Sequence, residues 1–531
     1  MSSGDLFIRH IFGGGFATDR GPSTDAAPQM VGRGTAQLVI PYLTQADNLM
    51  FDLDGGPTKS PGTAKINSSA LESGAAIRGC YDFWTSIGGS TQHRVVHVGT
   101  KIKADNADGT FTDIATGVSA DAIPSYATFN DELILSDTSG SAPRKWTGTG
   151  SSAVLGGSPP AFSFCVEHKG RLWAAGVTAQ PSRLYYSDPF DHETWSGNYI
   201  TVGTNDGSGI TGIVSHKDAL VIFKGPKKGS IHVLAGDNLT SFSLARLRDK
   251  CGSAVWHNAI FPYQDDLGFV AADGSIQRLQ ATAAFGSFQL THLSRDITKY
   301  LDNNVARTHL KKCCAVNWES RGVVLFTLPV NASSFCNTIL MMDYRFGDTP
   351  RFSPWPGYSG YCNSAALAVN DSDSSRQVAI VGGNDGYLRS LNLSALSIDE
   401  VTAINANLKT PNLSYGTPHQ KKTLVRGALG FLPLTDDEVD FTWYRDDGTT
   451  GTFAVDQGGG DLLTPTTGSP FTLDTSVLSG NQFVDRWFET HDGGQSRTFA
   501  YQIANADLTG DFELHTLSTF MSGALDSMEN A

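Results

Sequence analysis

Short runs of apolar residues alternate with polar residues along most of the chain, and each run ends at a turn-forming sequence. Residues 127–138, 164–176 and 212–225 are examples: a first apolar run reaches a charged turn (ND, HKG or HKD), and a β-branched or aromatic run follows. Alternation with a period of two, interrupted by such turns, is typical of β-hairpins. Long runs with helical periodicity are scarce, so the pattern predicts an all-β fold.

The hairpins recur between residues 81 and 403, and this recurrence predicts a β-propeller. Propeller blades are small antiparallel sheets, and known repeats of this kind span roughly 40–45 residues. The 323 residues from 81 to 403 therefore accommodate about seven blades, with six or eight also compatible. Because the repeats have diverged, an irregular β protein with several sheets remains the alternative.

The two flanks of this region have a different character. Residues 1–80 are rich in Gly and Pro and predict an extended N-terminal arm, in which 47–67 forms a strand, an Asp-Gly-Gly turn and a second strand. Residues 404–520 contain alternating strands joined by Gly-rich turns, which predict a β-sandwich-like domain. The polar residues 521–531 predict a flexible tail.

Two segments are predicted to be helical. Residues 294–310 begin with Ser294, a residue type preferred at the N-cap, and apolar residues then recur on one helical face. We expect this helix to cross between two blades. A shorter helix is expected around 394–404.

Composition and charge narrow the class of protein. A chain of 531 residues with 57 Gly and 22 Pro fits two or three domains rich in turns. The formal net charge is −14, whereas proteins that bind nucleic acid tightly are usually basic. Residues 404–531 hold 17 acidic and 7 basic side chains, a net of −10. An acidic wall lets DNA slide past without binding, and an acidic surface also serves solubility.

Cysteine usage and hydropathy bear on the compartment. The seven cysteines contain no CxxC pair, and the first residues lack the basic and apolar regions of a secretion signal. We therefore expect free thiols, synthesis in a reducing cytoplasm and, because no 18-residue apolar run occurs, no stable membrane insertion. Cys313 and Cys314 would point to opposite faces of a strand, and we interpret them as small buried residues.

The sequence offers little catalytic chemistry. It contains no GxSxG, HExxH or GxxxxGK[ST] motif, and its 13 His residues are dispersed. We expect no enzyme activity, no catalytic residue, no cofactor and no metal site. Residues 52–60 and 105–113 begin like calcium loops but lack the later oxygen ligands and the distal Glu, so hairpin turns are favoured.

Two segments are candidates for contact with a partner. Residues 183–196 end in a partial Asp box, a turn found in sialidase-like propellers. Glycoside hydrolysis needs facing carboxylates or a Tyr with a base, which this segment does not define, so we expect Asp191 to cap a turn. Lys224, Lys227 and Lys228 are predicted on a hairpin tip, where a solvated loop is the default and contact with a partner or DNA phosphate is the alternative.

Several stretches together resemble one family, the propeller-containing tail proteins of tailed bacteriophages, known as nozzle, tail-hub or head-completion (DNA-stabilisation) proteins. The strongest likeness is in 168–176 with 182–196, and 46–67, 215–236 and 342–357 are also similar. The resemblance is one of pattern, and it extends over most of the chain before the C-terminal domain, which resembles no family.

The resemblance implies a structural protein of the virion. Six copies would form a ring, the tail nozzle or hub, that continues the DNA channel below the portal and adaptor and supports genome retention and ejection. Its partners would be further copies of the chain, the portal or adaptor, other tail proteins and tail fibres, with double-stranded DNA in transit. The alternatives are a glycan-binding or glycan-hydrolysing propeller, and a tail-fibre or receptor-binding subunit, which would predict trimers and β-helical repeats.

Overall fold

A computed structural model gives the fold of the chain, which divides into two compact units. Unit 1 comprises residues 1–64, 341–357 and 392–531, and unit 2 comprises residues 65–340 and 358–391. The structure describes residues 5–12, 16–18, 29–32, 35–40, 42–52, 56–86, 90–195, 197–203, 206–225, 229–238, 240–249, 253–282, 287–346, 349–369, 376–415, 419–432, 438–457, 484–489, 494–508 and 513–522.

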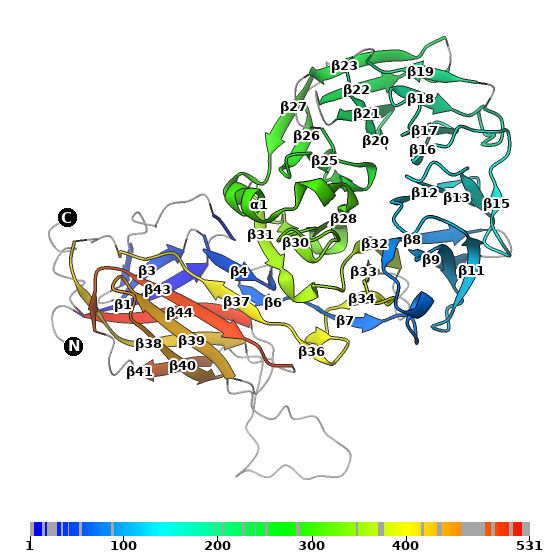
Figure 1. Cartoon of the computed structure of the whole chain (residues 1–531). Helices are drawn as coiled ribbons and strands as arrows, with labels where there is room; N and C mark the ends of the chain where they lie inside the picture. The colour runs from blue at the N-terminus through cyan, green and yellow to red at the C-terminus, as the bar shows by residue number, and fades with distance from the viewer. Residues whose placement is uncertain are drawn as a thin grey trace. The chain divides into compact units, whose positions relative to one another are not determined.

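Unit 2 consists of small antiparallel sheets that follow one another along the chain (Figure 1). Within each four-stranded sheet the strands are hydrogen-bonded in sequence order, so each of these sheets is a series of hairpins. The four-stranded sheets are β8 (Ile77–Thr85), β9 (Thr91–Val98), β10 (Lys101–Asp105) and β11 (Phe111–Thr116); β12 (Pro124–Phe129), β13 (Glu132–Asp137), β14 (Arg144–Trp146) and β15 (Ala153–Val154); β16 (Phe164–His168), β17 (Arg171–Ala175), β18 (Arg183–Tyr186) and β19 (Tyr199–Thr201); β20 (Gly209–His216), β21 (Ala219–Gly225), β22 (Ser230–Ala235) and β23 (Ser243–Asp249); and β24 (Ile260–Tyr263), β25 (Asp266–Val270), β26 (Ile276–Thr282) and β27 (Ser287–His292). Two more sheets begin in unit 2 with β28 (Cys314–Trp318), β29 (Val323–Leu328) and β30 (Thr338–Asp343), and with β32 (Ser364–Val369), β33 (Gln377–Gly382) and β34 (Leu388–Asn392).

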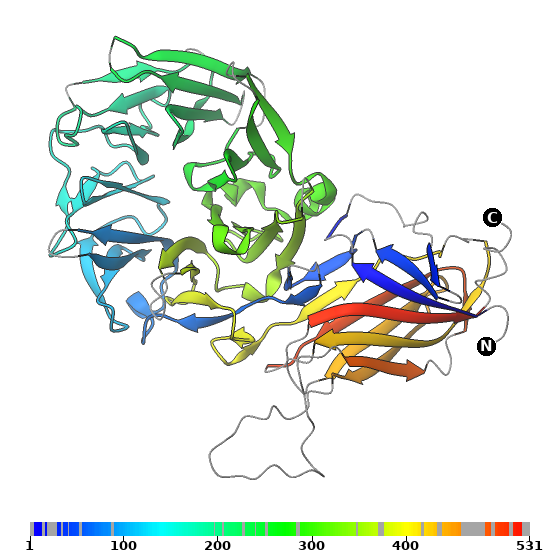
Figure 2. The same cartoon turned by 180° about the vertical axis from the view of Figure 1, so that it is seen from behind.

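The first strands of these sheets form a closed ring (Figures 1 and 2). Strands β8, β12, β16 and β20 lie beside one another in that order, the 3-10 turn η2 (His257–Ala259) links β20 to β24, and β28 and β32 follow. Strand β32 then lies beside β8, which closes the ring. Small antiparallel sheets arranged around a ring are consistent with a β-propeller, as the hairpin pattern predicts.

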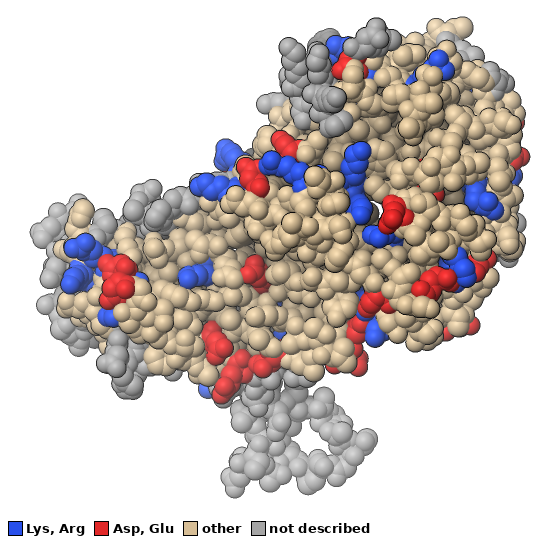
Figure 3. Space-filling view, in the orientation of Figure 1, with Lys and Arg blue, Asp and Glu red and all other residues tan. Residues whose placement is uncertain are grey.

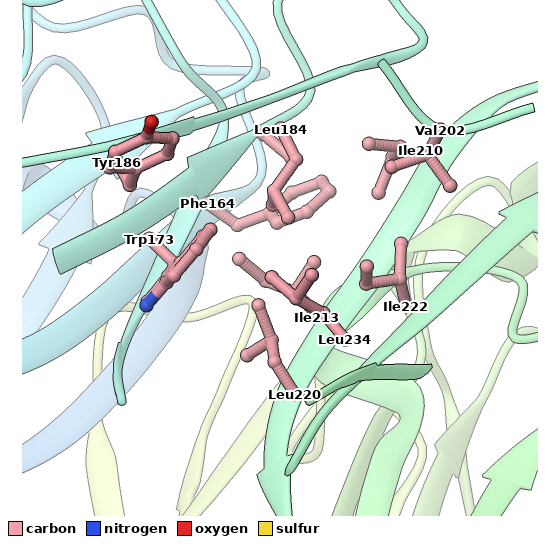
Figure 4. Close-up of a cluster of buried hydrophobic side chains, with 11 residues drawn as sticks. Phe164, Trp173, Leu184, Tyr186, Val202, Ile210, Ile213, Leu220, Ile222 and Leu234 are labelled. Carbon is pink, nitrogen blue, oxygen red and sulfur yellow. The ribbon is translucent and has the colours of Figure 1, made fainter. Parts of the chain in front are cut away.

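Apolar side chains are buried between neighbouring sheets. Phe164, Trp173 and Leu184 of the β16–β19 sheet pack against Ile213 and Ile222 of the β20–β23 sheet, all at most 1% exposed (Figure 4). Similar clusters fill the spaces between the other described neighbours from β8 to β27. Fully burying one such side chain stabilises a protein by about 1.5–3 kcal/mol, so each sheet depends on its neighbours for stability.

Ring closure uses the same packing between sheets that are distant in sequence. Ile77 and Val96 of the first sheet pack against Ala368, Ile380 and Leu388 of the last. The carboxylate of Asp82 adds polar contacts, because it accepts hydrogen bonds from Gln92 Nε2 at 2.8 Å and from the backbone N–H of Val369 at 3.1 Å. The first and last sheets are therefore joined by apolar and polar contacts alike.

The charged turns form tight hairpins as predicted. Asn130 and Asp131 connect β12 to β13 with φ of 49° and 58°, and Lys169 and Gly170 connect β16 to β17 with φ of 51° and 70°. Two successive residues with positive φ give a type I′ turn, whose twist matches that of paired strands. These turns explain why Asn, Asp and Gly occupy the hairpin tips.

Unit 1 contains two sheets built from both ends of the chain. The nine-stranded sheet runs β2-β3-β1-β44-β38-β41, with β5, β6 and β42 attached, and the five-stranded sheet runs β4-β37-β43-β39-β40. The strands of this unit are β1 (Asp5–Phe12), β2 (Gln29–Gly32), β3 (Thr35–Ile40), β4 (Gln45–Asp47), β5 (Leu49–Phe51), β6 (Pro57–Lys59), β7 (Gly62–Lys65), β31 (Arg351–Trp355), β35 (Ser397–Ile398), β36 (Thr402–Ala403), β37 (Ala406–Lys409), β38 (Lys422–Leu432), β39 (Glu438–Arg445), β40 (Thr450–Asp456), β41 (Val484–Glu489), β42 (Gln495–Ser496), β43 (Phe499–Asn505) and β44 (Glu513–Ser522).

The expected domain boundaries are corrected by these pairings. Residues 1–80 were expected to form a separate extended arm, but β1 pairs antiparallel with β44 and parallel with β3 in the sheet of unit 1. The hairpin expected within 47–67 is present as β5 and β6. Backbone N–H and C=O groups need partners, and the C-terminal strands provide them for the N-terminal strands. The tail expected at 521–531 lies outside the described residues from 523 onward.

The two sheets of unit 1 pack face to face through aromatic side chains. The ring centroids of Phe441 and Phe488 are 4.4 Å apart, and those of His10 and Tyr501 are 5.8 Å apart. His10 is fully buried and its Nε2 lies 2.9 Å from the hydroxyl of Thr519. A buried polar pair therefore links β1 to β44 within this core.

The expected helices are only partly present. The segment 294–310 forms the 3-10 turn η3 (Arg295–Ile297), the short helix α1 (Thr298–Asn304) and the 3-10 turn η4 (Arg307–Lys312). Ser294 makes no side-chain cap; its hydroxyl instead accepts a hydrogen bond from the N–H of Ile276 at 2.9 Å. The helix expected at 394–404 is wrong, because β35 and β36 pair there. The remaining 3-10 turns are η1 (Leu71–Ser73), η5 (Glu319–Arg321) and η6 (Pro356–Tyr358).

Candidate functional site

The first strands of the sheets in unit 2 surround a central cavity of about 490 Å³. Every one of these strands or its preceding turn contributes to the lining, from β8 and β12 through to β28 and β32. Because the strands belong to different sheets, the cavity exists only when the ring is closed.

Aromatic side chains form much of one wall of the cavity. Tyr81 and Tyr126 stack at a centroid distance of 5.4 Å, and Tyr81 shares a hydrogen bond of 3.1 Å with Thr128. The hydroxyl of Tyr126 is buried and has no hydrogen-bond partner among the described residues. Burial raises the pKa of Tyr126 well above its usual value, so this phenol stays protonated.

A histidine and two thiols on the other walls are also neutral, and the carboxylate of Asp82, which accepts hydrogen bonds from Gln92 and Val369, lines the cavity beside them. His257 stacks on Phe164 at 4.9 Å, and burial lowers its pKa to about 4, so its imidazole is uncharged at neutral pH. Burial raises the pKa of the thiols of Cys80 and Cys314. A thiol reacts as a nucleophile through its thiolate, so these thiols are poorly suited to nucleophilic chemistry. Cys313 and Cys314 are both buried, as predicted.

One mouth of the cavity lies where the first strands begin. Arg78, Asp121, Lys312 and Asn363 line a small hollow of about 10 Å³ beside the central cavity. Arg78 lies in β8, Asp121 precedes β12, Lys312 precedes β28 and Asn363 precedes β32, so four consecutive members of the ring contribute one residue each. We call these residues, together with Lys311, the basic mouth. Figure 3 shows basic side chains with an acidic one beside them over the middle of the ring.

The contacts of the basic mouth leave its charge unbalanced. Arg78 lies 3.5 Å from the carboxylate of Asp121, whose side chain is 89% exposed. Lys312 Nζ donates to the carbonyl of Ser334 at 2.7 Å, and Lys311 Nζ lies 5.3 Å from the ring centroid of Trp256. Burial lowers the pKa of Lys312, and the nearby guanidinium of Arg78 lowers it further.

The structure describes one of the three lysines that the sequence predicted on a hairpin tip. Lys227 and Lys228 lie outside the described residues. Lys224 lies within β21, not on a hairpin tip, and is fully buried. Its Nζ donates to the carbonyls of Val202 and Gly203 at 2.5 and 2.7 Å and pairs with Asp206 at 2.7 Å. The expectation that Lys224 meets a partner or DNA is therefore corrected, because its ammonium group is used internally.

The turn at Asp191, which follows β18, has the structural role that was predicted for it. Asp191 accepts hydrogen bonds from the N–H of Glu193 and the hydroxyl of Thr194, both at 2.8 Å. These bonds lower the pKa of Asp191, in agreement with its role in holding the turn. Trp195 is buried and stacks near Phe162 at 5.7 Å. The aromatic anchor and the capping carboxylate are thus as expected.

The segment 105–113 is also a turn. Asp108 accepts hydrogen bonds from the N–H of Thr110 at 2.9 Å and from its hydroxyl at 2.6 Å, between β10 and β11. In the described part of the chain, no group of three or more His, Cys, Asp and Glu side chains lies together as a metal site requires. No helix among the described residues is long and apolar enough to cross a membrane.

Sequence reasoning missed the basic mouth entirely. Arg78, Lys312 and Asn363 lie far apart in the chain and belong to no motif. Their only shared signal is position, because each stands within two residues of the start of a ring-forming strand. That signal is usable only when the strand order in the ring is known.

Comparisons with known proteins give no family. No family model matches the chain, and no curated protein matches it. Among solved structures, the computationally designed Ika8 protein is 15% identical, with a TM-score of 0.34, and the match covers 62% of this chain and 99% of that one. The N-terminal domain of Nup159 is 10% identical, with a TM-score of 0.38 and coverage of 66% and 99%. A chain of the S. cerevisiae complex of Dbp5 with Nup159 and Gle1 is 9% identical, with a TM-score of 0.38 and coverage of 65% and 97%.

Proposed function

We propose that this chain is a non-enzymatic structural protein of a tailed-phage virion, a nozzle or hub subunit of the tail. Copies would assemble into a ring of six that continues the DNA channel below the portal and adaptor, contacts other tail proteins and fibres, and supports genome retention and ejection. In this proposal unit 2 is a seven-bladed propeller and unit 1 a β-sandwich-like domain.

One observation carries the proposal: three of the segments that resemble tail proteins, including the pair with the strongest likeness, fall in order on two successive sheets of unit 2. Residues 168–176 span the hairpin of β16 and β17, and residues 182–196 span β18 and the loop before β19. Residues 215–236 then run from the end of β20 through β22 in the next sheet. The resemblance is thus one of blade architecture, which is where members of a structural family would share residues.

The chemistry of the central cavity supports a structural role. Its tyrosines and thiols stay protonated, its histidine is uncharged at neutral pH, and the carboxylate of Asp82 in its lining is held by hydrogen bonds from Gln92 and Val369. Catalytic acids and bases usually have pKa values close to the working pH. The net charge of −14 also suits a wall along which DNA passes without binding.

The glycan-binding or glycan-hydrolysing propeller remains the second candidate, and one side chain favours it. Phe190 is 75% exposed, and its backbone carbonyl accepts a hydrogen bond from Asn130 Nδ2 at 2.9 Å. An aromatic ring exposed to solvent on an anchored backbone is a suitable surface for a sugar. The adjacent Asp191 is occupied in its own turn, so the carboxylate pair needed for hydrolysis is not evident here.

The mass of the full chain in solution and its copy number in particles test the proposal. We expect light scattering to give a hexamer, or quantitative gels of disrupted virions to give about six copies per particle. A monomer that is absent from every virion fraction and binds or cleaves oligosaccharides would overturn the tail proposal and favour the second candidate. Phe190→Ala is the matched variant, because it should abolish oligosaccharide binding without changing assembly.

A further inference from the structure

The basic mouth combines a local excess of positive charge with an acidic chain. Arg78 and Lys312 line the hollow together with the carboxylate of Asp121, and Lys311, which follows next to Lys312 in the chain, supplies a third cation outside this lining. Lys311 and Lys312 have no carboxylate within ion-pair distance in the part of the chain that the structure describes. Arg78 and Lys312 line the same hollow and repel each other, and an anionic group placed between them would remove that cost.

The hollow also contains a hydrogen-bond acceptor without a donor. Asn363 is 4% exposed, and its Oδ1 has no partner among the described residues. Its Nδ2 donates to the carbonyl of Ile77 at 2.8 Å, which fixes the orientation of the amide. A buried acceptor left unpaired costs about 1–3 kcal/mol. The site therefore calls for a ligand that brings both an anion and a donor.

These two requirements identify the chemistry of the ligand. A peptide segment with Asp or Glu supplies a carboxylate for Arg78 and Lys312 and a backbone N–H for Asn363. A phosphodiester supplies the anion but no donor, so a nucleic acid backbone fits less well. The volume of about 10 Å³ admits a group the size of one water molecule, which matches a single carboxylate oxygen.

We infer that the basic mouth of unit 2 is a docking site for an acidic segment of unit 1 from a second copy of this chain. The inference rests on the proposed ring and deepens it, because it names the surfaces that join neighbouring copies. A contact between two different surfaces is heterologous, and repetition of such a contact closes into a ring when the rotation permits.

Unit 1 offers a complementary patch. Glu438, Asp440 and Asp507 are exposed at one end of its five-stranded sheet, where β39 lies beside β43. Asn505 joins them, because its Nδ2 donates to the carbonyl of Glu438 at 3.2 Å and to the carboxylate of Asp507 at 3.3 Å. We call these three carboxylates the acidic patch. The net charge of −10 in residues 404–531 adds long-range attraction.

Charge reversal of the full chain tests the inference by light scattering. The mouth variant is K311E/K312E, the patch variant is E438K/D440K/D507K, and the combined variant carries all five changes. We expect the wild type to assemble, each single-surface variant to lose at least tenfold in assembly affinity, and the combined variant to recover most of it. The control variant K217E/K421E reverses two exposed lysines elsewhere and should assemble like the wild type. Thermal melting of every variant checks that it is folded.

The outcomes separate the inference from the proposed function. If the wild type forms a ring and the mouth variant forms it equally well, the ring stands and the docking site is overturned. If the wild type stays monomeric and is absent from virions, the proposed function fails.

The docking chemistry is then tested by titrating the full chain with a synthetic peptide of residues 434–443. Saturable binding that K311E/K312E weakens at least tenfold supports the site, and absence of binding overturns it. An oligonucleotide of mixed sequence is titrated in parallel, and tighter binding of it than of the peptide would overturn the choice of a peptide.

Discussion

Replacing the buried Lys224 by Met is expected to destabilise unit 2 severely. The ammonium group is fully buried and holds the segment before β20 through the carbonyls of Val202 and Gly203 and the carboxylate of Asp206. Met has similar length and apolarity along the stem but no donor. The substitution therefore leaves two carbonyls and a carboxylate without their buried partner.

The magnitude follows from the kind of contact that is lost. Removing one member of a buried ion pair costs about 3–5 kcal/mol, because the remaining charge is left without compensation. The side chain of Asp206 is 18% exposed, so water can relieve part of this penalty. We therefore expect a loss of about 3 kcal/mol in the free energy of unfolding. Burial raises the pKa of Asp206, but the hydrogen bond and charge of Lys224, together with the N–H of Ser208 and the nearby His232, keep that pKa low, so it should rise in the variant.

Urea denaturation followed by tryptophan fluorescence measures this loss. The control is Lys217→Met, which changes an exposed lysine in the turn between β20 and β21 and should alter stability by no more than about 0.5 kcal/mol. A double variant with Asp206→Asn should lose less than the sum of the two single losses, because the two groups interact directly. If Lys224→Met lowers the free energy of unfolding by less than about 1 kcal/mol, the buried contacts of Lys224 do not stabilise unit 2 as we infer.

Three further perturbations test other parts of the fold. Burial lowers the pKa of His10 from its usual 6.5 to about 3. The contribution of the neutral His10 to stability is therefore complete above pH 6.5 and is lost as the pH falls toward 3. Between pH 7 and 4.5 the wild type should lose about 2–3 kcal/mol more in its free energy of unfolding by urea than His10→Leu. Equal losses would refute this. Asp191→Ala removes the acceptor that holds a turn and should cost about 1 kcal/mol, measured as a lower melting temperature, whereas no change would contradict the capping role. Gly157 has a φ of 70°, and a Cβ there would collide with the carbonyl of Glu193, so Gly157→Ala should destabilise unit 2 by more than 2 kcal/mol. The control is Gly140→Ala, where φ is 80° but no atom lies within 4 Å of the added Cβ, and it should cost roughly half as much. Similar costs at the two glycines would show that the collision is relieved.

Local chemistry determined the elements that the sequence could predict. The tight turn at Asn130 and Asp131 depends on two residues that tolerate positive φ, and the turn at Asp191 depends on a carboxylate two residues before the N–H that it binds. The alternation of apolar and polar residues likewise reflects the period of a strand. Each of these patterns lies within a few residues, so the strand or turn that it forms can be predicted without knowledge of the rest of the chain.

The same local reasoning failed where distant residues compete. Ser294 has the residue type of a helix cap, but its hydroxyl binds the N–H of Ile276 in a neighbouring strand. The N-terminal strands read as an arm because nothing nearby in sequence pairs with them, yet Ile8 pairs with Thr519. When a backbone group forms its hydrogen bond with a residue about 500 positions away, the sequence around either partner contains no pattern that reveals the pairing.

The candidate site depends on the tertiary structure more than any strand or turn does. The sequence marked Lys224 because a lysine beside a turn is usually solvated, whereas the tertiary structure surrounds it with carbonyls and a carboxylate. Conversely, Arg78, Lys312 and Asn363 carry no motif, and they meet because ring closure brings the starts of β8, β28 and β32 together. The sequence by itself determined that strands form and where they turn, because those choices are made by neighbouring residues. Only the closed ring decided which charges are buried and which share a surface, because that depends on the order in which separate sheets pack.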